Sequence, residues 1–183
     1  VEANIEQPWD WLGLSGNPNI TIGMVQSNIE QPWDWFELSV NPSITMSIVE
    51  SMPDIPWDWS GLSANPNVTI EIVKSNSDKP WNWKWLSQNP NITIDIVEAM
   101  GIVESSVNTS WDWSLLSKHL NITIDFVKAN IDKSWDWLEL SRNPSITMNM
   151  VEENLDKPWN WSGISTNPNV TMSMVESNPN KAW

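Results

Sequence analysis

The chain has 183 residues, 40% of them hydrophobic, and contains 16 Trp, two Phe and neither Tyr nor Cys. Its formal net charge of -14 disfavours nucleic acid and anionic membranes as partners, because both bind clusters of Lys and Arg. The lack of cysteine excludes disulfides, thiolate metal sites and cysteine nucleophiles. No apolar run approaches the roughly 20 residues that span a bilayer.

Pairs of the form Trp-x-Trp recur along the whole chain, beginning at Trp9, Trp33, Trp57, Trp81, Trp111, Trp135 and Trp159. Self-similarity at a fixed period of 24 residues indicates a tandem repeat. The predicted units are 9–32, 33–56, 57–80, 81–110, 111–134, 135–158 and 159–182, the fourth with a six-residue insertion. Both ends fall inside a unit, so we expect residues 1–183 to be one repeat array from the interior of a longer one.

The first segment of each unit is predicted to be a helix from about Asp10 to Ser15. A short side-chain oxygen at its start can accept hydrogen bonds from the first-turn N–H groups. Trp11 and Leu14 then share one helical face, and Pro18 ends the helix, because proline disfavours a helical residue before it. The capping position recurs as Asp34, Asp58, Asn82, Asp112, Asp136 and Asn160.

The second segment of each unit is predicted to be a helix from Thr21, as its N-cap, to about Asn28. Acidic residues two places after the threonine suit the positive end of a helix. They occur at Glu71, Asp95 and Asp125. The capping threonine recurs as Thr45, Thr69, Thr93, Thr123, Thr147 and Thr171.

A strand is the alternative for the second segment, since residues 92–96 alternate between apolar and polar side chains. That alternative implies a β-solenoid or a leucine-rich-like coil. The adjacent apolar Met24 and Val25 break the alternation, and the apolar spacing before Asn17 departs from the leucine-rich pattern. We therefore predict an all-α solenoid of short helix-turn-helix repeats of 24 residues.

Helices this short are marginal alone, so neighbouring repeats should bury their apolar side chains together. We expect equivalent indoles to align in two columns along the array. The Asn column Asn17, Asn41, Asn65, Asn89, Asn143 and Asn167 should form a hydrogen-bonded ladder. The predicted core comprises Trp9, Trp11, Leu14, Trp33, Trp35, Leu38, Trp57, Trp59, Trp81, Trp83, Trp111, Trp113, Trp135, Trp137, Trp159 and Trp161.

Two motifs carry a resemblance to a known family: Lys157-Pro158-Trp159-Asn160-Trp161 and the segment 165–171, Ser-Thr-Asn-Pro-Asn-Val-Thr. They resemble the tryptophan-rich tandem-repeat proteins of mimivirus-like giant viruses, over the whole chain. The resemblance implies a viral protein, expected in the host cytoplasm or the virion rather than secreted and glycosylated. It implies no particular activity. The chain departs from the pattern where His119-Leu120 replaces Asn-Pro and where Ser110 and Ser134 replace Pro.

Catalytic and metal-binding chemistry finds little support in the sequence. His119, the single histidine, stands where other units carry Asn and has no nucleophile or acid as a motif partner. One carboxylate per unit supplies too few oxygens for calcium, so helix capping is the favoured role of the Asp10 position. The Asn-x-Thr sequences at Asn19, Asn67, Asn91, Asn121 and Asn169, and the Asn-x-Ser sequences at Asn108 and Asn160, are expected to serve turns and caps rather than carry glycans. We predict no enzyme activity, no metal and no cofactor.

The residues just after each Trp-x-Trp pair vary between units, which is how repeat proteins diversify binding. Phe36, Trp85 and Leu115 at these positions would mark a partner contact if exposed. The predicted function is a non-enzymatic repeat scaffold that binds a protein partner. The alternatives are a filament or virion component that self-associates end to end, and a carbohydrate-binding Trp array.

Overall fold

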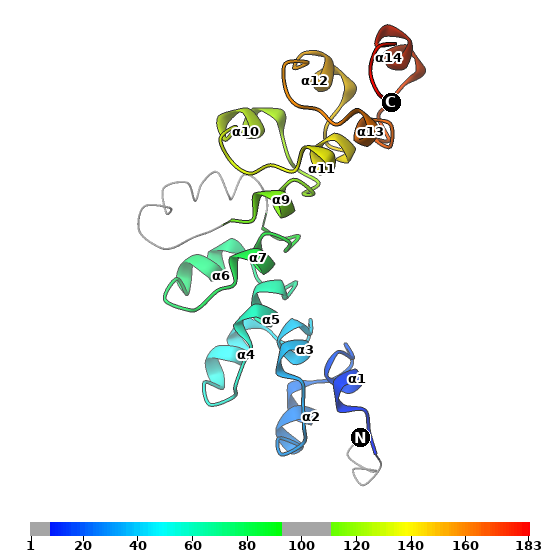
Figure 1. The fold of residues 1–183 in the computed structure, drawn as a ribbon. Helices are drawn as coiled ribbons and strands as arrows, with labels where there is room; N and C mark the ends of the chain where they lie inside the picture. The colour runs from blue at the N-terminus through cyan, green and yellow to red at the C-terminus, as the bar shows by residue number, and fades with distance from the viewer. Residues whose placement is uncertain (1–7, 93–110) are drawn as a thin grey trace. The chain divides into compact units, whose positions relative to one another are not determined.

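The computed structural model describes residues 8–92 and 111–183, within two compact units, 1–92 and 93–183, that are treated separately below. Thirteen short α-helices form the described part of the chain, and no strand occurs in it (Figure 1). The all-α prediction is confirmed for these residues, and the β alternative is wrong for them. The six-residue insertion lies outside the described ranges.

Each described repeat begins with a helix led by the second Trp of its Trp-x-Trp pair. The first unit contains α1 (Trp11–Ser15), α3 (Trp35–Val40), α5 (Trp59–Ala64) and α7 (Trp83–Leu86). The second unit contains α9 (Trp113–Leu116), α11 (Trp137–Arg142) and α13 (Trp161–Ile164). A second helix follows the threonine, giving α2 (Ile22–Ser27), α4 (Met46–Ser51), α6 (Ile70–Ser75), α10 (Ile124–Ala129), α12 (Met148–Glu152) and α14 (Met172–Ser177).

Short polar side chains begin these helices, as local hydrogen bonding requires. At α3, Asp34 is the N-cap and its Oδ1 accepts from the Glu37 N–H at 2.9 Å. Every first helix in the described ranges starts in this way, from Asp10, Asp34, Asp58, Asn82, Asp112, Asp136 or Asn160. Among the second helices, the hydroxyls of Thr21, Thr123, Thr147 and Thr171 accept from the main chain, whereas those of Thr45 and Thr69 do not. Thr93 lies outside the described residues.

Consecutive first helices pack on one another. In the first unit α1 contacts α3, α3 contacts α5, and α5 contacts α7; in the second unit α11 contacts α13. The leucine before the recurring serine is buried at each interior contact, as at Leu38, Leu62, Leu86, Leu116 and Leu140. Burial of this side chain between repeats explains why a helix of four to six residues persists.

The two indoles of each pair have different environments. From the second repeat on, the first Trp is generally buried, and the Trp33 Nε1–H donates to the Asn28 carbonyl at 2.8 Å. Its ring meets the second Trp of the preceding repeat edge to face, with the Trp11 and Trp33 centroids 4.8 Å apart. The touching rings are therefore not equivalent ones, and the prediction of two columns of equivalent indoles is wrong in this respect.

Four groups of predicted core residues fall short of full burial, and one of them is Trp57 alone, which is half-buried in the third repeat. Trp9 is 36% exposed, because the described chain places no earlier repeat against it. Leu14 is half-buried for the same reason. The second Trp of each pair is half-buried, since one side of its ring borders solvent; these residues are Trp11, Trp35, Trp59, Trp83, Trp113, Trp137 and Trp161.

Candidate interaction surface

A buried asparagine joins a repeat to the one before it at five positions, Asn41, Asn65, Asn89, Asn143 and Asn167, whereas the fifth repeat carries His119 there. Asn65 is 1% exposed, and its Nδ2 donates to the carbonyls of Ser39 at 2.7 Å, Asn41 at 3.0 Å and Ile44 at 3.1 Å. Its Oδ1 accepts from the Asn67 N–H, which closes the turn. Asn167 makes the same set of bonds in the second unit. The expected Asn ladder thus runs from side-chain amide to main-chain carbonyl.

A serine at the end of the first helix forms a second joint, at Ser15, Ser39, Ser63, Ser117 and Ser141, that the sequence analysis did not identify. Ser63 Oγ donates to the Trp59 carbonyl at 2.6 Å and accepts from the Asn82 N–H of the next repeat at 2.9 Å. Ser15 and Ser39 accept in the same way from Asp34 and Asp58. The recurrence of a serine directly after the leucine is the sequence feature that could have indicated this joint. Both joints use main-chain partners, so they leave the neighbouring side chains unconstrained.

The amides of interior Asn-x-Thr sequences also bind the preceding repeat. Asn67 Nδ2 donates to the Pro42 carbonyl at 2.7 Å, and Asn169 Nδ2 donates to the Pro144 carbonyl at 2.7 Å. Asn91 makes the corresponding bond to Pro66. These amides serve the junction between repeats.

Two of the three predicted contact residues lie against each other. The rings of Phe36, on α3, and Trp85, on α7, have centroids 5.6 Å apart and an interplanar angle of 53°. They meet beside α5, where Gly61 is buried and offers no side chain. Both aromatic residues are half-buried. Together, Phe36, Gly61 and Trp85 form a surface, hereafter the aromatic patch, that draws on three repeats.

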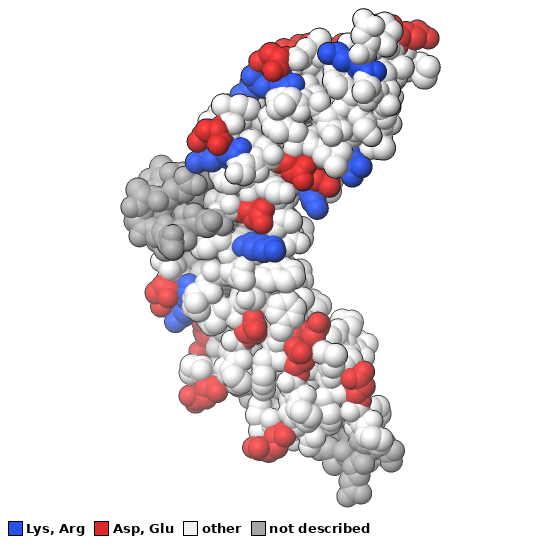
Figure 2. Space-filling model, viewed as in Figure 1, with Lys and Arg blue, Asp and Glu red and all other residues white. Residues whose placement is uncertain are grey.

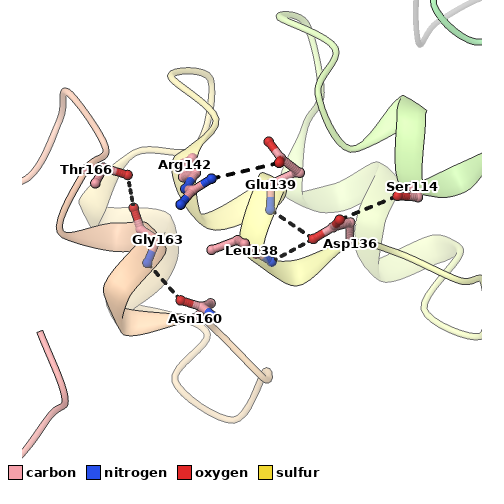
Figure 3. Close-up of polar contacts among 8 residues, drawn as sticks. All are labelled: Ser114, Asp136, Leu138, Glu139, Arg142, Asn160, Gly163 and Thr166. Atoms are coloured by element: carbon pink, nitrogen blue, oxygen red, sulfur yellow. Dashed lines mark hydrogen bonds and ion pairs between the residues drawn. The ribbon is translucent and has the colours of Figure 1, made fainter.

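The corresponding positions of the second unit carry no aromatic side chain and mix polar with apolar residues: Ser114, Leu115, Leu138, Glu139, Ser162 and Gly163. Ser114 Oγ donates to Asp136 Oδ2 at 3.5 Å, while Asp136 Oδ1 caps α11 through the N–H groups of Leu138 and Glu139 (Figure 3). Glu139 also pairs with Arg142 at 3.9 Å. Leu115, the third predicted contact residue, is half-buried here. The same positions therefore build an aromatic contact in one unit and a mixed polar and aliphatic surface in the other.

Figure 2 shows acidic side chains spread over the described repeats, with basic side chains beside several of them. Exposed pairs of adjacent residues account for part of this pattern, at Asp78–Lys79, Asp132–Lys133 and Asp156–Lys157. Such pairs add little stability, because solvent screens them. Within 8–92 and 111–183, no cluster of three or more His, Cys, Asp or Glu side chains could hold a metal ion. The helices described in these ranges are too short to cross a bilayer.

Thr69 is the N-cap of α6, but its hydroxyl binds the Glu71 carboxyl group instead of accepting from a helix N–H. A hydrogen bond from the Thr69 hydroxyl lowers the pKa of Glu71, aided by the Glu71 N–H and by the charge of Lys74. Because this pKa is lower in the folded chain, the resulting stabilisation is present above the unfolded value and is lost as pH falls through the folded value.

We expect Thr69→Ala to raise the pKa of Glu71 toward its ordinary value, since the main cause of the shift is removed. NMR titration of the Glu71 side-chain carboxyl measures this directly. Lys74→Met should raise the pKa less, because the lysine contributes the smallest part of the shift. An unchanged pKa in Thr69→Ala would show that the hydroxyl does not hold the carboxylate.

Comparison with known proteins adds no relative to this picture. No family model matches the chain, and neither a curated protein nor a solved structure matches it. The surfaces that the repeats present are therefore the features of this chain that point to a function.

Proposed function

We propose that this chain is a non-enzymatic scaffold, a solenoid of helix pairs that binds a protein partner through the variable side of its first helices. The observation that carries the proposal is the aromatic patch, in which Phe36 and Trp85 from separate repeats meet over Gly61. Large, half-buried aromatic side chains are the usual anchors of protein interfaces.

The joints between repeats support this proposal. Asn65 and Ser63 bind main-chain groups of neighbouring repeats, so the positions after each Trp-x-Trp pair can change without loss of these bonds. A constant frame with changeable positions is the arrangement by which repeat proteins acquire partners. On the basis of the resemblance to tandem-repeat proteins of giant viruses, we further propose a viral origin and a partner in the infected cell.

The carboxylates also favour binding over catalysis. Asp34, Asp58 and Asp136 each accept hydrogen bonds from helix N–H groups through Oδ1, so one oxygen of each carboxylate is already used in capping. A general base needs to reach a proton on a substrate. Capping carboxylates at the first turn of a helix are poorly suited to that role.

Capture of partners on the immobilised chain, followed by measurement of Kd with the purified partner, tests the proposal. We expect the double variant Phe36→Ser/Trp85→Ser to bind at least about tenfold more weakly, since anchors of this type each contribute about 2 kcal/mol or more. The matched control is Ile29→Ser/Ile131→Ser, which changes two side chains that are 41% and 47% exposed and that follow α2 and α10 rather than lying on a first helix.

Equal Kd values for the two double variants would refute a role for the aromatic patch. Sedimentation velocity on the same samples examines the alternative of self-association. Concentration-dependent polymers that the patch variant abolishes would make a second copy of this chain the partner.

A further inference from the structure

The first unit holds an open pocket of about 490 Å³ beside α4 and the loop after α6. Its lining combines two indoles, from Trp57 and Trp59, with Pro53 and Pro56, and it carries the charged side chains of Glu50 and Lys79. This volume lies within the range of pockets that enclose a ligand or an inserted side chain.

The second repeat, which supplies part of the lining, differs from other repeats at Met52 and at Ile55, whose position is held elsewhere by Gln31, Lys79, Lys133, Lys157 and Lys181. Met52 stands where Asn28 and Asn154 donate to the carbonyls four residues before them. The following indole is looser, since the Trp35 and Trp57 centroids lie 6.2 Å apart, whereas the other edge-to-face pairs lie at 4.8 to 5.2 Å. Trp57 is half-buried as a result and contributes to the open lining.

In two repeats, a lysine ammonium group lies over the ring of the second Trp of a Trp-x-Trp pair. In the last repeat the Lys181 ammonium lies over the Trp161 ring, 4.9 Å from its centroid. Lys133 lies over Trp113 in the same way, at 5.7 Å. In each case the lysine follows the indole by 20 residues. A cation above an indole face is stabilised by the ring quadrupole.

Lys79 holds the equivalent place relative to Trp59 but has a different partner. Its ammonium pairs with Asp78 at 3.2 Å, whereas the residue before Lys181 is the uncharged Asn180. The other lining positions match closely, because Met46, Val49 and Glu50 correspond to Met148, Val151 and Glu152. An aspartate before the lysine does not by itself prevent this contact, because Lys133 pairs with Asp132 at 3.7 Å and still lies 5.7 Å from the Trp113 centroid. The shorter Asp78–Lys79 pair draws its ammonium further toward the carboxylate, so Trp59 faces an open pocket while Trp161 is covered by a lysine.

We propose that this pocket binds the ammonium of a lysine side chain from a basic segment of the partner protein. This inference rests on the proposed function and names the chemistry of its partner. The indole of Trp59 would receive the cation as Trp161 receives Lys181, and the Glu50 carboxylate would supply the opposite charge. The net charge of -14 attracts basic segments and repels acidic ones.

The test uses the full chain with 15N-labelled tryptophan. The probe is Nα-acetyl-lysine methylamide, which keeps its ε-ammonium, and the neutral match is Nα-acetyl-norleucine methylamide. We expect the indole N–H signals of Trp57 and Trp59 to shift with the lysine probe only. Signals are assigned with Trp57→Phe and Trp59→Phe. Equal shifts with both probes would mean that the pocket takes apolar chains, and would overturn the proposal.

Asp78→Asn gives the sharper result. It reproduces the Asn180-Lys181 pair, so Lys79 should move over Trp59 and weaken binding of the lysine probe at least about fivefold. Lys79→Met removes this competitor and should strengthen binding. Asp156→Asn, which releases the equivalent Lys157 in another repeat, is the control and should leave the affinity unchanged. Unchanged affinity in Asp78→Asn would overturn the proposal.

The two proposals fail in different ways. If the chain captures its partner through the aromatic patch but gives no lysine-specific shift, only the proposal for the pocket is overturned. A lysine-specific shift in a chain that binds no protein overturns the assignment of the ligand to a partner segment.

Discussion

Replacing Asn65 by alanine should lower the free energy of unfolding by on the order of 3 kcal/mol, because buried carbonyls lose their donor. The amide binds the carbonyls of Ser39, Asn41 and Ile44 and is 1% exposed. Water cannot reach these oxygens without separating the repeats. Urea denaturation followed by circular dichroism measures the loss.

Asn17→Ala is the matched control. Asn17 occupies the same place in the first described repeat, is exposed, and accepts from the Asn19 N–H at 2.9 Å, as Asn65 accepts from Asn67. Its substitution should cost about 1 kcal/mol or less, the value of one exposed turn hydrogen bond. Similar losses in the two variants would show that the turn, rather than the junction between repeats, accounts for the effect.

Elements that depend on nearby residues were predictable from the sequence. The caps at Asp34 and Thr123 follow from hydrogen bonds that span three residues, so a short motif contains both partners. Helix starts and the 24-residue recurrence followed from the same local signals. Leu38 was correctly placed in the core, since it lies on the helical face that the Trp defines.

Contacts between repeats were less predictable, because they depend on how one unit docks on the next. Trp11 meets Trp33 rather than Trp35, and no periodicity in the sequence states that choice. Phe36 and Trp85 were identified as variable residues that would mark a partner contact if exposed, whereas their mutual contact passes across a whole repeat. Ser63 was missed because serine at a helix end suits solvent as well as a buried junction.

The pocket beside α4 illustrates how changes within one repeat alter such docking. Met52 replaces the asparagine that other repeats carry at this position. From the sequence, this replacement indicates only the loss of one hydrogen bond at the end of the helix. The structural consequence appears one repeat away from the helix, in the wider separation of Trp35 and Trp57 and in the exposure of Trp57. A prediction of this kind requires the geometry of the junction.

Gly61→Ala should destabilise the chain by about 2 kcal/mol, although alanine is the better helix former. Gly61 has no positive φ, so its role is space rather than backbone freedom. A Cβ there would lie 2.6 Å from the Phe36 carbonyl oxygen and 2.8 Å from the Ser39 Cβ, which would force α3 and α5 apart. Thermal and urea unfolding measure the change.

Gly163 and Gly23 provide a graded comparison. A Cβ at Gly163 would come within 3.0 Å of the Leu138 carbonyl oxygen, so Gly163→Ala should cost less than Gly61→Ala. At Gly23 the nearest atom is Thr21 Oγ1 at 3.9 Å, and Gly23→Ala should stabilise α2 by about 0.5–1 kcal/mol. A stabilising effect at Gly61 would contradict the close approach of α3 and α5.

The glycine also connects helix spacing to partner binding. Gly61 lets α3 approach α5 closely, and Phe36 lies on α3, so forcing α3 from α5 should open the contact between the Phe36 and Trp85 rings. Gly61→Ala should therefore weaken capture of the partner even in conditions where the chain stays folded, while Gly23→Ala leaves capture intact. Undiminished capture by a folded Gly61→Ala chain would separate the aromatic patch from the binding surface and direct attention to other first-helix positions.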